Sequence, residues 1–131
     1  MANITGTISD DVLNGTNKAD TISGLAGNDT IYGKNGNDLL YGGDGIDTIW
    51  GGKNDDQIWG DDGDDFLYGE ANNDLLYGGA GNDYLDGGSG TNQLWGEAGN
   101  DILLGGTSTD YLYGGDDNDT LSGGSGNDQL W

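Results

Sequence analysis

The sequence predicts an all-β solenoid in which two nine-residue units form each coil and the strands lie in two parallel sheets. Residues 6–131 divide into 14 consecutive units of nine residues, with no insertion or deletion between them. Gly stands at the first position of every unit, and Ile or Leu stands at the eighth. A period kept without slippage requires every unit to follow a path of the same length, as the repeats of a solenoid do.

Composition excludes the main alternative folds. The chain of 131 residues contains 29 Gly and no Pro. Glycine at this density disfavours helices. Collagen is excluded as well, because it requires Gly at every third residue together with abundant Pro. We therefore expect one domain, with residues 1–5 as a lead-in and residues 6–131 as a single repeat array. No apolar stretch is long enough to cross a bilayer, and the first residues lack a signal-peptide core.

Charge and missing residue types exclude several functions. The formal charge is −21, from 24 acidic and 3 basic residues, and the chain contains neither Cys nor His. Such a surface repels nucleic acids and anionic membranes, so neither is expected as a partner. Disulfides, thiolate metal sites and the commonest general base are absent. Paired carboxylates resemble those of a glycosidase, but they recur in every unit whereas an active site is singular. We expect no enzyme.

Each unit combines a turn and a strand. Its last three positions, as in residues 30–32 and 57–59, are rich in β-branched and aromatic side chains and predict a short strand. The first six positions, rich in Gly, Asn and Asp, predict a turn. Because side chains alternate along a strand, the eighth position faces the core and the seventh and ninth face away. Strand, turn, return strand and turn close a coil of 18 residues, which predicts seven coils.

The sixth position brings carboxylates together. Asp38 lies one coil from Asp56, which lies one coil from Asp74. Two carboxylates so stacked repel by about 1 kcal/mol even at the dielectric constant of water. A divalent cation between the two carboxylates replaces this repulsion with attraction. Because the ligands would all be oxygen atoms of flexible loops, the site favours Ca²⁺ over Mg²⁺. The predicted ligands are Asp11, Asp20, Asp29, Asp38, Asp47, Asp56, Asp65, Asp74, Asp83, Asp101, Asp110, Asp119 and Asp128, with Asn92 as a weaker ligand. Because the acidic residues repel one another, we expect the metal-free chain to be disordered.

The unit at residues 78–86, Gly-Gly-Ala-Gly-Asn-Asp-Tyr-Leu-Asp, reads G-G-x-G-x-D-x-U-x, where U is a large aliphatic residue. This pattern resembles the RTX (repeats-in-toxin) or haemolysin-type calcium-binding repeats, and the resemblance covers residues 6–131. It implies a right-handed parallel β-roll with Ca²⁺ between the turns of alternate units. Seven stacked turns along each edge leave six gaps, so about twelve ions at most are implied.

The resemblance also implies the ligands of each ion: the sixth-position Asp of both flanking turns, with carbonyls from positions two and four of one turn and one and three of the next. One central site would use Lys34, Gly36 and Asp38 with Gly51, Lys53 and Asp56. Its neighbour on the other edge would use Gly43, Gly45 and Asp47 with Gly60, Asp62 and Asp65. The glycine carbonyls implied are those of Gly27, Gly36, Gly43, Gly45, Gly51, Gly60, Gly63, Gly69, Gly78, Gly79, Gly81, Gly87, Gly88, Gly90, Gly96, Gly99, Gly105 and Gly114.

Two places depart from the pattern. The two units at residues 6–23 lack Gly at both the second and the fourth positions. At the fourth position, Gly is expected because the backbone there should adopt a left-handed conformation. These two units are either an N-terminal cap with weak or absent ion sites or an example of ordinary drift in a terminal repeat. Asn92 stands between Asp74 and Asp110 and removes one charge from each of two sites. Those two sites should be the weakest of the interior.

The ninth position of the even-numbered units forms an aromatic ladder, which consists of Tyr41, Trp59, Tyr77, Trp95, Tyr113 and Trp131. We expect these rings mainly to stack along the sheet and shield its backbone. The alternative is a Ca²⁺-rigidified adhesive roll whose aromatic face binds a sugar, a partner or a second copy.

The resemblance implies a structural module that stays unfolded in the calcium-poor cytosol and folds after export from the cell. The sequence shows no N-terminal signal peptide and no C-terminal secretion signal after Trp131. A fragment of a longer chain, a stand-alone or designed roll, and an oligomer joined through its ends or its aromatic face all remain open.

Overall fold

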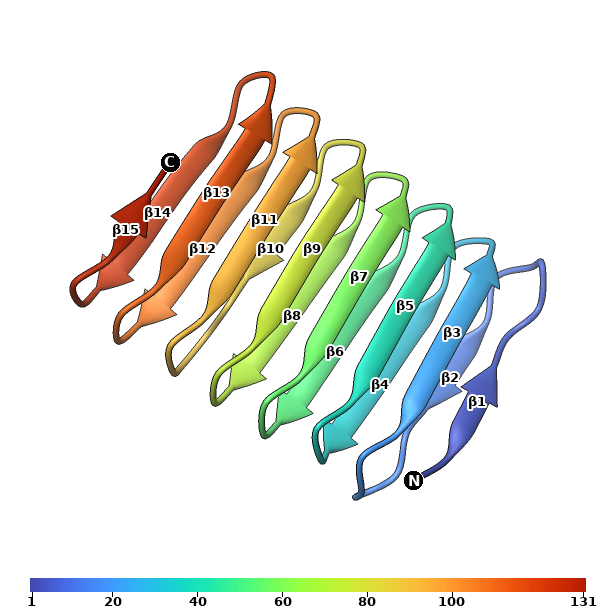
Figure 1. Ribbon diagram of the computed structural model, residues 1–131. Helices are drawn as coiled ribbons and strands as arrows, with labels where there is room; N and C mark the ends of the chain where they lie inside the picture. The colour runs from blue at the N-terminus through green and yellow to red at the C-terminus, as the bar shows by residue number, and fades with distance from the viewer.

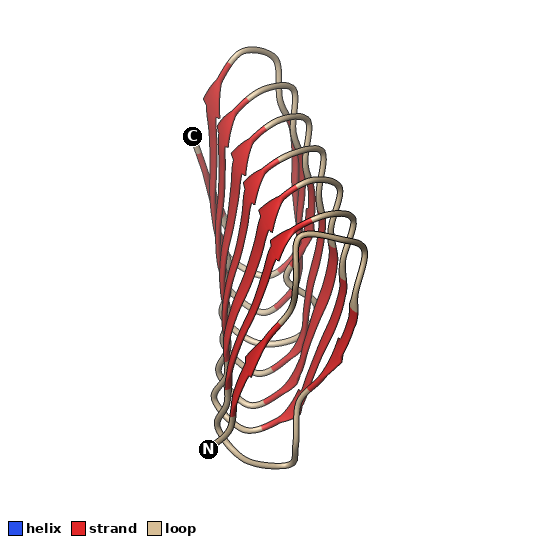
Figure 2. Ribbon diagram, turned by 90° about the vertical axis from the view of Figure 1, so that its right-hand side faces the viewer, coloured by secondary structure: helices blue, strands red, loops and turns tan.

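The structure is a computed structural model that describes residues 1–131 and contains strands but no helix. The strands follow one another along a single axis, and the two termini lie at opposite ends of the stack (Figure 1). Viewed from its end, the chain winds through two facing sheets joined by loops along both edges (Figure 2). The structure has no helix that is long and apolar enough to span a membrane.

Consecutive strands alternate between the two sheets, and all paired strands are parallel. The eight-stranded sheet contains, in order, β1 (Asn3–Thr5), β3 (Thr21–Ala26), β5 (Leu39–Asp44), β7 (Gln57–Asp62), β9 (Leu75–Ala80), β11 (Gln93–Ala98), β13 (Tyr111–Asp116) and β15 (Gln129–Leu130). The seven-stranded sheet contains β2 (Val12–Asn14), β4 (Thr30–Asn35), β6 (Thr48–Lys53), β8 (Phe66–Ala71), β10 (Tyr84–Asp86), β12 (Ile102–Thr107) and β14 (Thr120–Ser125).

The register confirms the predicted coil of 18 residues. Ile22 pairs with Leu40 in one sheet, and Ile31 pairs with Ile49 in the other. Every eighth-position residue therefore lies directly beside the eighth-position residue of the next coil. The predicted fold, a β-solenoid with two parallel sheets, is confirmed.

The strands are longer than the sequence predicts. Most of them span six residues, because the ladder continues through the first three positions of the following unit. In β5 these positions are Gly42, Gly43 and Asp44. Glycine lacks a side chain that would favour a strand, but its backbone N–H and C=O groups still pair with the neighbouring coils. The turn proper is therefore reduced to about three residues.

The lead-in also contributes a strand. Residues Asn3–Thr5 form β1, which pairs with β3 through Ile4 and Ile22. Ile4 precedes Leu13 by nine residues and so continues the eighth-position series into the lead-in. The lead-in thus adds a short strand to the eight-stranded sheet.

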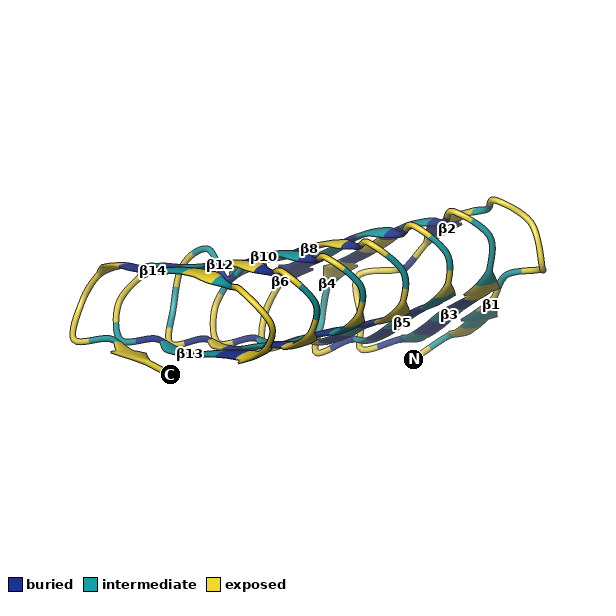
Figure 3. Cartoon of the chain, turned by 90° about the horizontal axis from the view of Figure 1, so that it is seen from above, coloured by how far each residue is buried: buried dark blue, intermediate teal, exposed yellow.

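The eighth-position side chains form the core, as predicted. Twelve of them, from Leu13 to Leu112, make one buried cluster, and Ile4 and Leu121 pack against it partly buried. The cluster runs along the whole stack between the two layers, which are seen from above in Figure 3. Leu130 in β15 lies outside the cluster and is 43% exposed.

The turns repeat one backbone conformation. From the third unit onward, the residues at the second and fourth positions of every unit have positive φ. Gly45 and Gly63 adopt this conformation at the fourth position without steric cost, but Leu25 and Glu70 adopt it at the second position with side chains that disfavour it. The sequence predicts positive φ at the fourth position only. The first two turns contain no residue with positive φ, so their conformation is different.

Truncation of the core in the middle of the stack should destabilise the protein far more than the same change at its end. Leu76→Ala empties a fully buried position and should reduce the free energy of unfolding by about 2–5 kcal/mol. Leu130→Ala, at a half-exposed position, should reduce it by about 1 kcal/mol or less. Chemical denaturation of both variants in saturating Ca²⁺ measures the difference, and equal losses would contradict the assigned core.

Candidate metal centre

The sixth-position residues stack into one ladder along each edge of the solenoid. Those from Asp20 to Asp110 are buried. One oxygen of each carboxylate, Oδ1, accepts a hydrogen bond from the backbone N–H of the residue one coil earlier. Asp56 Oδ1 lies 2.8 Å from Asp38 N, and Asp65 Oδ1 lies 2.7 Å from Asp47 N. The predicted stacking of these carboxylates is therefore present on both edges.

The second carboxylate oxygen, Oδ2, has no hydrogen-bond partner in nine of these residues. All nine atoms are buried; they belong to Asp29, Asp38, Asp47, Asp56, Asp65, Asp74, Asp83, Asp101 and Asp110. A buried charged acceptor without a partner is costly, so native proteins pair such atoms with a donor, a water or a cation. The same unpaired atom recurs in nine of the 14 units and therefore indicates a repeated ligand rather than a local irregularity.

The first position must be glycine, because the carboxylate and the next coil approach its Cα closely. A Cβ atom added to Gly33 would lie 2.7 Å from Asp38 Oδ2 and 2.5 Å from the carbonyl oxygen of Gly51 in the next coil. At Gly69, the corresponding distances are 2.6 Å to Asp74 Oδ2 and 2.8 Å to the Gly87 carbonyl oxygen. The carboxylate oxygen and the carbonyl oxygen of the following coil thus both lie beside the same glycine Cα. Both atoms belong to the ligand set that the family resemblance implies.

No cluster of three or more acidic side chains that could hold a metal ion forms anywhere in the structure. Backbone carbonyls must therefore supply most ligands of any ion bound between two stacked carboxylates. Such a set contains oxygen alone and includes flexible glycine backbone, which is the environment that Ca²⁺ accepts and that the smaller, strictly octahedral Mg²⁺ does not favour. The residues present thus fit a calcium ion.

Burial raises the pKa of the stacked carboxyls in the absence of an ion. It raises the pKa of Asp38 and Asp47 to about 6, that of Asp65 and Asp83 to about 7, and that of Asp74 to about 8. Neighbouring carboxylates shift these pKa values in the same direction, whereas the hydrogen bond from the backbone N–H opposes them. Without a cation, the centre of each ladder therefore retains protons near neutral pH.

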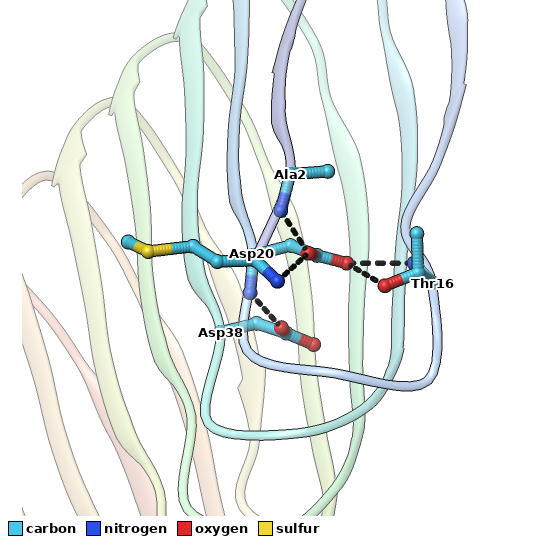
Figure 4. A network of polar contacts seen from close by, with 5 residues as sticks. Ala2, Thr16, Asp20 and Asp38 are labelled. Atoms are coloured by element: carbon cyan, nitrogen blue, oxygen red, sulfur yellow. Dashed lines mark hydrogen bonds and ion pairs between the residues drawn. The ribbon is translucent and has the colours of Figure 1, made fainter.

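The first two turns satisfy their carboxylates in another way. Asp20 Oδ2 accepts hydrogen bonds from the backbone N–H and the hydroxyl of Thr16, each at 2.7 Å (Figure 4). Asp11 Oδ2 is bonded in the same manner by Thr7, at 2.6 and 2.9 Å. The Thr16 hydroxyl is the main cause of a lowered pKa for Asp20. Sequence reasoning missed these threonines, although both stand at the second position of their units.

The aromatic ladder has the predicted stacked arrangement. Its five consecutive ring pairs have centroids 4.5–5.5 Å apart and planes within 10° of parallel, from Tyr41–Trp59 to Tyr113–Trp131. A shorter stack of Tyr32, Trp50 and Tyr68 lies on the other sheet. Stacking at these distances stabilises the parallel register of the strands and covers part of each ring.

The stacked coils and the two ladders of buried carboxylates define this protein as a β-solenoid with repeated acidic turns. A sequence model of the RTX calcium-binding nonapeptide repeat, four copies long, matches the chain at residues 5–40, 32–67, 41–76, 59–94, 68–103 and 95–130. The chain therefore belongs to the family of RTX calcium-binding nonapeptide repeats. No curated protein matches it closely enough to count as a relative.

Removing a carboxylate of the ladder should weaken calcium binding much more than removing the exposed carboxylate next to it in the sequence. Asp65→Asn deletes a buried carboxylate whose Oδ2 lacks a partner, and should raise the Ca²⁺ concentration needed for half-maximal binding by about tenfold. Asp64→Asn makes the same charge change at an exposed residue of the same turn and should have a small effect. Isothermal titration calorimetry compares the two variants, and similar affinities would exclude Asp65 as a ligand.

The pH dependence of folding should be opposite in sign with and without calcium. The carboxyl pKa values of the metal-free fold are raised above the ordinary Asp value of 3.8, so protons bind the folded chain more tightly than the unfolded one. This stabilisation is fully present below about pH 3.8 and is lost as the pH rises through about 6 to 8. In Ca²⁺ the folded state should instead lose stability on acidification, because protons compete with the ion.

Circular dichroism between pH 3 and 9, in chelator and in excess Ca²⁺, measures both trends. In chelator, β-structure should decrease as the pH rises. A metal-free chain that gains β-structure between pH 6 and 8 would contradict the assigned burial of the carboxyls.

Proposed function

We propose that this chain is a calcium-binding structural module that folds when Ca²⁺ binds and is disordered without it. The observation that carries the proposal is the set of nine buried Oδ2 atoms without a partner. When these carboxyls are ionised, the folded state, in which alone they are buried, requires positive charge between the coils. An ion that binds the folded but not the unfolded chain stabilises folding by mass action, so binding and folding form one equilibrium.

The side chains and backbone of each turn have distinct tasks in this proposal. The sixth-position carboxylate binds the previous coil through Oδ1 and offers Oδ2 to the ion. The first-position glycine allows the carboxylate and the next coil to approach closely, and its carbonyl oxygen lies beside the same glycine Cα as the Oδ2 atom of the previous coil. Calcium supplies two positive charges and accepts oxygen ligands at flexible distances. About twelve ions are the upper limit, and the two N-terminal turns bind weakly or not at all because threonine already satisfies their carboxylates.

The family and the charge support an extracellular role. A chain with a formal charge of −21 lacks a means of neutralising its carboxylates where free calcium is scarce. We therefore propose that it stays unfolded in the cytosol and becomes rigid in a calcium-rich medium, where it stiffens or spaces the parts attached to it. Catalysis is not part of the proposal, because the carboxylate arrangement is identical in successive coils.

The aromatic ladder supports a second candidate function, which is self-association of the calcium-loaded roll. The six rings lie on the outer surface of the eight-stranded sheet, and Trp131 is 59% exposed. Sedimentation velocity in Ca²⁺ tests this candidate with Trp59→Thr and Trp95→Thr. If wild type is a dimer and the variants are monomers, the face joins two copies; if wild type is a monomer, the rings serve only to stack.

A calcium titration tests the main proposal. Far-UV circular dichroism and tryptophan fluorescence, recorded from chelator into Ca²⁺ at pH 7.5, should show a single cooperative transition from coil to β-structure. The same titration with Mg²⁺ should show little change, because the site geometry suits the larger ion.

Two outcomes of this titration would contradict the proposal. If the chain is already β-structured in chelator at this pH, calcium is not required to offset the repulsion. If Mg²⁺ induces the same transition at the same concentrations, charge neutralisation alone suffices and the proposed selectivity is wrong.

A further inference from the structure

Asn92 is the single sixth-position residue that is not Asp, and its amide is fully hydrogen-bonded, whereas nine of the ladder carboxylates each have an oxygen without a partner. Its Oδ1 accepts a hydrogen bond from Asp74 N at 2.9 Å, as Oδ1 does in the Asp residues of the ladder. Its Nδ2 donates to the carbonyl oxygens of Gly90 and Gly105, at 3.4 Å each. The side chain is buried. Each of its polar atoms therefore has a partner.

The backbone fixes the orientation of this amide. If the group were rotated by 180°, the amino group would face the N–H of Asp74 and two donors would oppose each other. The rotated amide would also place its oxygen against the two carbonyl oxygens of Gly90 and Gly105. The observed orientation is the one in which every donor meets an acceptor.

The amino group occupies the place that belongs to Oδ2 in other turns. A Cβ atom added to Gly87 would lie 2.7 Å from Asn92 Nδ2 and 2.8 Å from the Gly105 carbonyl oxygen. At Gly33 the same two places are taken by Asp38 Oδ2 and the Gly51 carbonyl oxygen. A donor has thus replaced an acceptor at a point where a cation would need an acceptor.

The two carbonyls that the amino group binds are the ones a cation in this gap would need. Gly90 stands at the fourth position of the turn at residues 87–92, and Gly105 stands at the first position of the turn at residues 105–110. The family resemblance implies these two positions as ligands of an ion between the two turns. The N–H groups of Asn92 therefore provide the partial positive charge that an ion would provide elsewhere.

The same turn is also irregular in its backbone. Strand β10 stops at Asp86, whereas most strands of its sheet span six residues. Asp86 Oδ1 accepts a hydrogen bond from Gly88 N at 3.1 Å, whereas the Gly88 carbonyl still accepts one from Thr107 N and Ser89 still bridges both neighbouring coils. The turn that carries Asn92 is thus distinct by a second, independent feature.

We propose that the gap between the turns at residues 87–92 and 105–110 is a built-in ion-free joint, in which the Asn92 side-chain amide takes the place of a calcium ion. This proposal rests on the calcium-binding function proposed above, and it replaces the expectation that Asn92 coordinates weakly there. The ladder on the edge that contains Asp74 and Asp110 is then divided into two runs of ions. The ladder on the opposite edge, from Asp29 to Asp101, is continuous.

Counting ions in a single variant tests the joint. Asn92→Asp restores a carboxylate oxygen next to the Gly105 carbonyl, so the calcium-loaded variant should bind one ion more than wild type by native mass spectrometry. Asn127→Asp is the matched control: it makes the same charge change at an exposed residue outside the ladder and should leave the count unchanged. An unchanged count in Asn92→Asp would overturn the proposal.

The outcomes separate this proposal from the function on which it rests. If wild type binds no calcium, the proposed function itself fails. If wild type binds calcium and Asn92→Asp gains no ion, only the joint fails.

A measurement on the wild-type protein is independent of the folding of the variant. In ¹⁵N NMR spectra of the calcium-loaded chain, one side-chain amide should exchange its hydrogens with solvent unusually slowly, and this signal should be absent from Asn92→Asp. Rapid exchange of every side-chain amide would contradict the buried, doubly bonded amino group.

Discussion

The fold depends on what happens at the second oxygen of each stacked carboxylate. The first oxygen has a fixed role, because it ties one coil to the previous one through a backbone N–H group. The second oxygen is buried and has no protein partner in nine turns. It needs either a cation or a proton, and burial accordingly raises the pKa of the stacked carboxyls, that of Asp74 to about 8. The sequence provides few cations of its own, with only three basic residues among 131.

Other features of the unit follow from this constraint. The first position must be Gly because a Cβ atom there would collide with the carboxylate and with the next coil. Positive φ at the second and fourth positions shapes each turn from the third unit onward, even at residues such as Leu25 that disfavour it. The core contributes one aliphatic side chain per unit, and these side chains align the coils. They carry no charge, so the charged edges must be stabilised in another way.

Much of this arrangement could be predicted from the sequence, because a strict repeat encodes the same environment many times. The positions of Leu76 in the core and of Asp65 in a ladder follow from periodicity alone, and both are confirmed. The sequence underestimates strand length, since the first-position Gly and the Gly and polar residues that follow it indicate a turn when only propensity is considered. The roles of Thr16 and of the Asn92 amino group depend on which atom faces which neighbour, and that is determined only by the assembled stack.

Anomalous X-ray diffraction from crystals grown in calcium would test the central claim most directly, because it locates each ion without assumptions about ligands. The account predicts peaks beside the Oδ2 atoms of Asp38, Asp47 and Asp56, next to the first-position carbonyl of the following coil. It predicts no peak beside the side-chain amide of Asn92. Ordered water at all these Oδ2 atoms, with calcium confined to the outer surface, would contradict the claim that the ion holds the coils together.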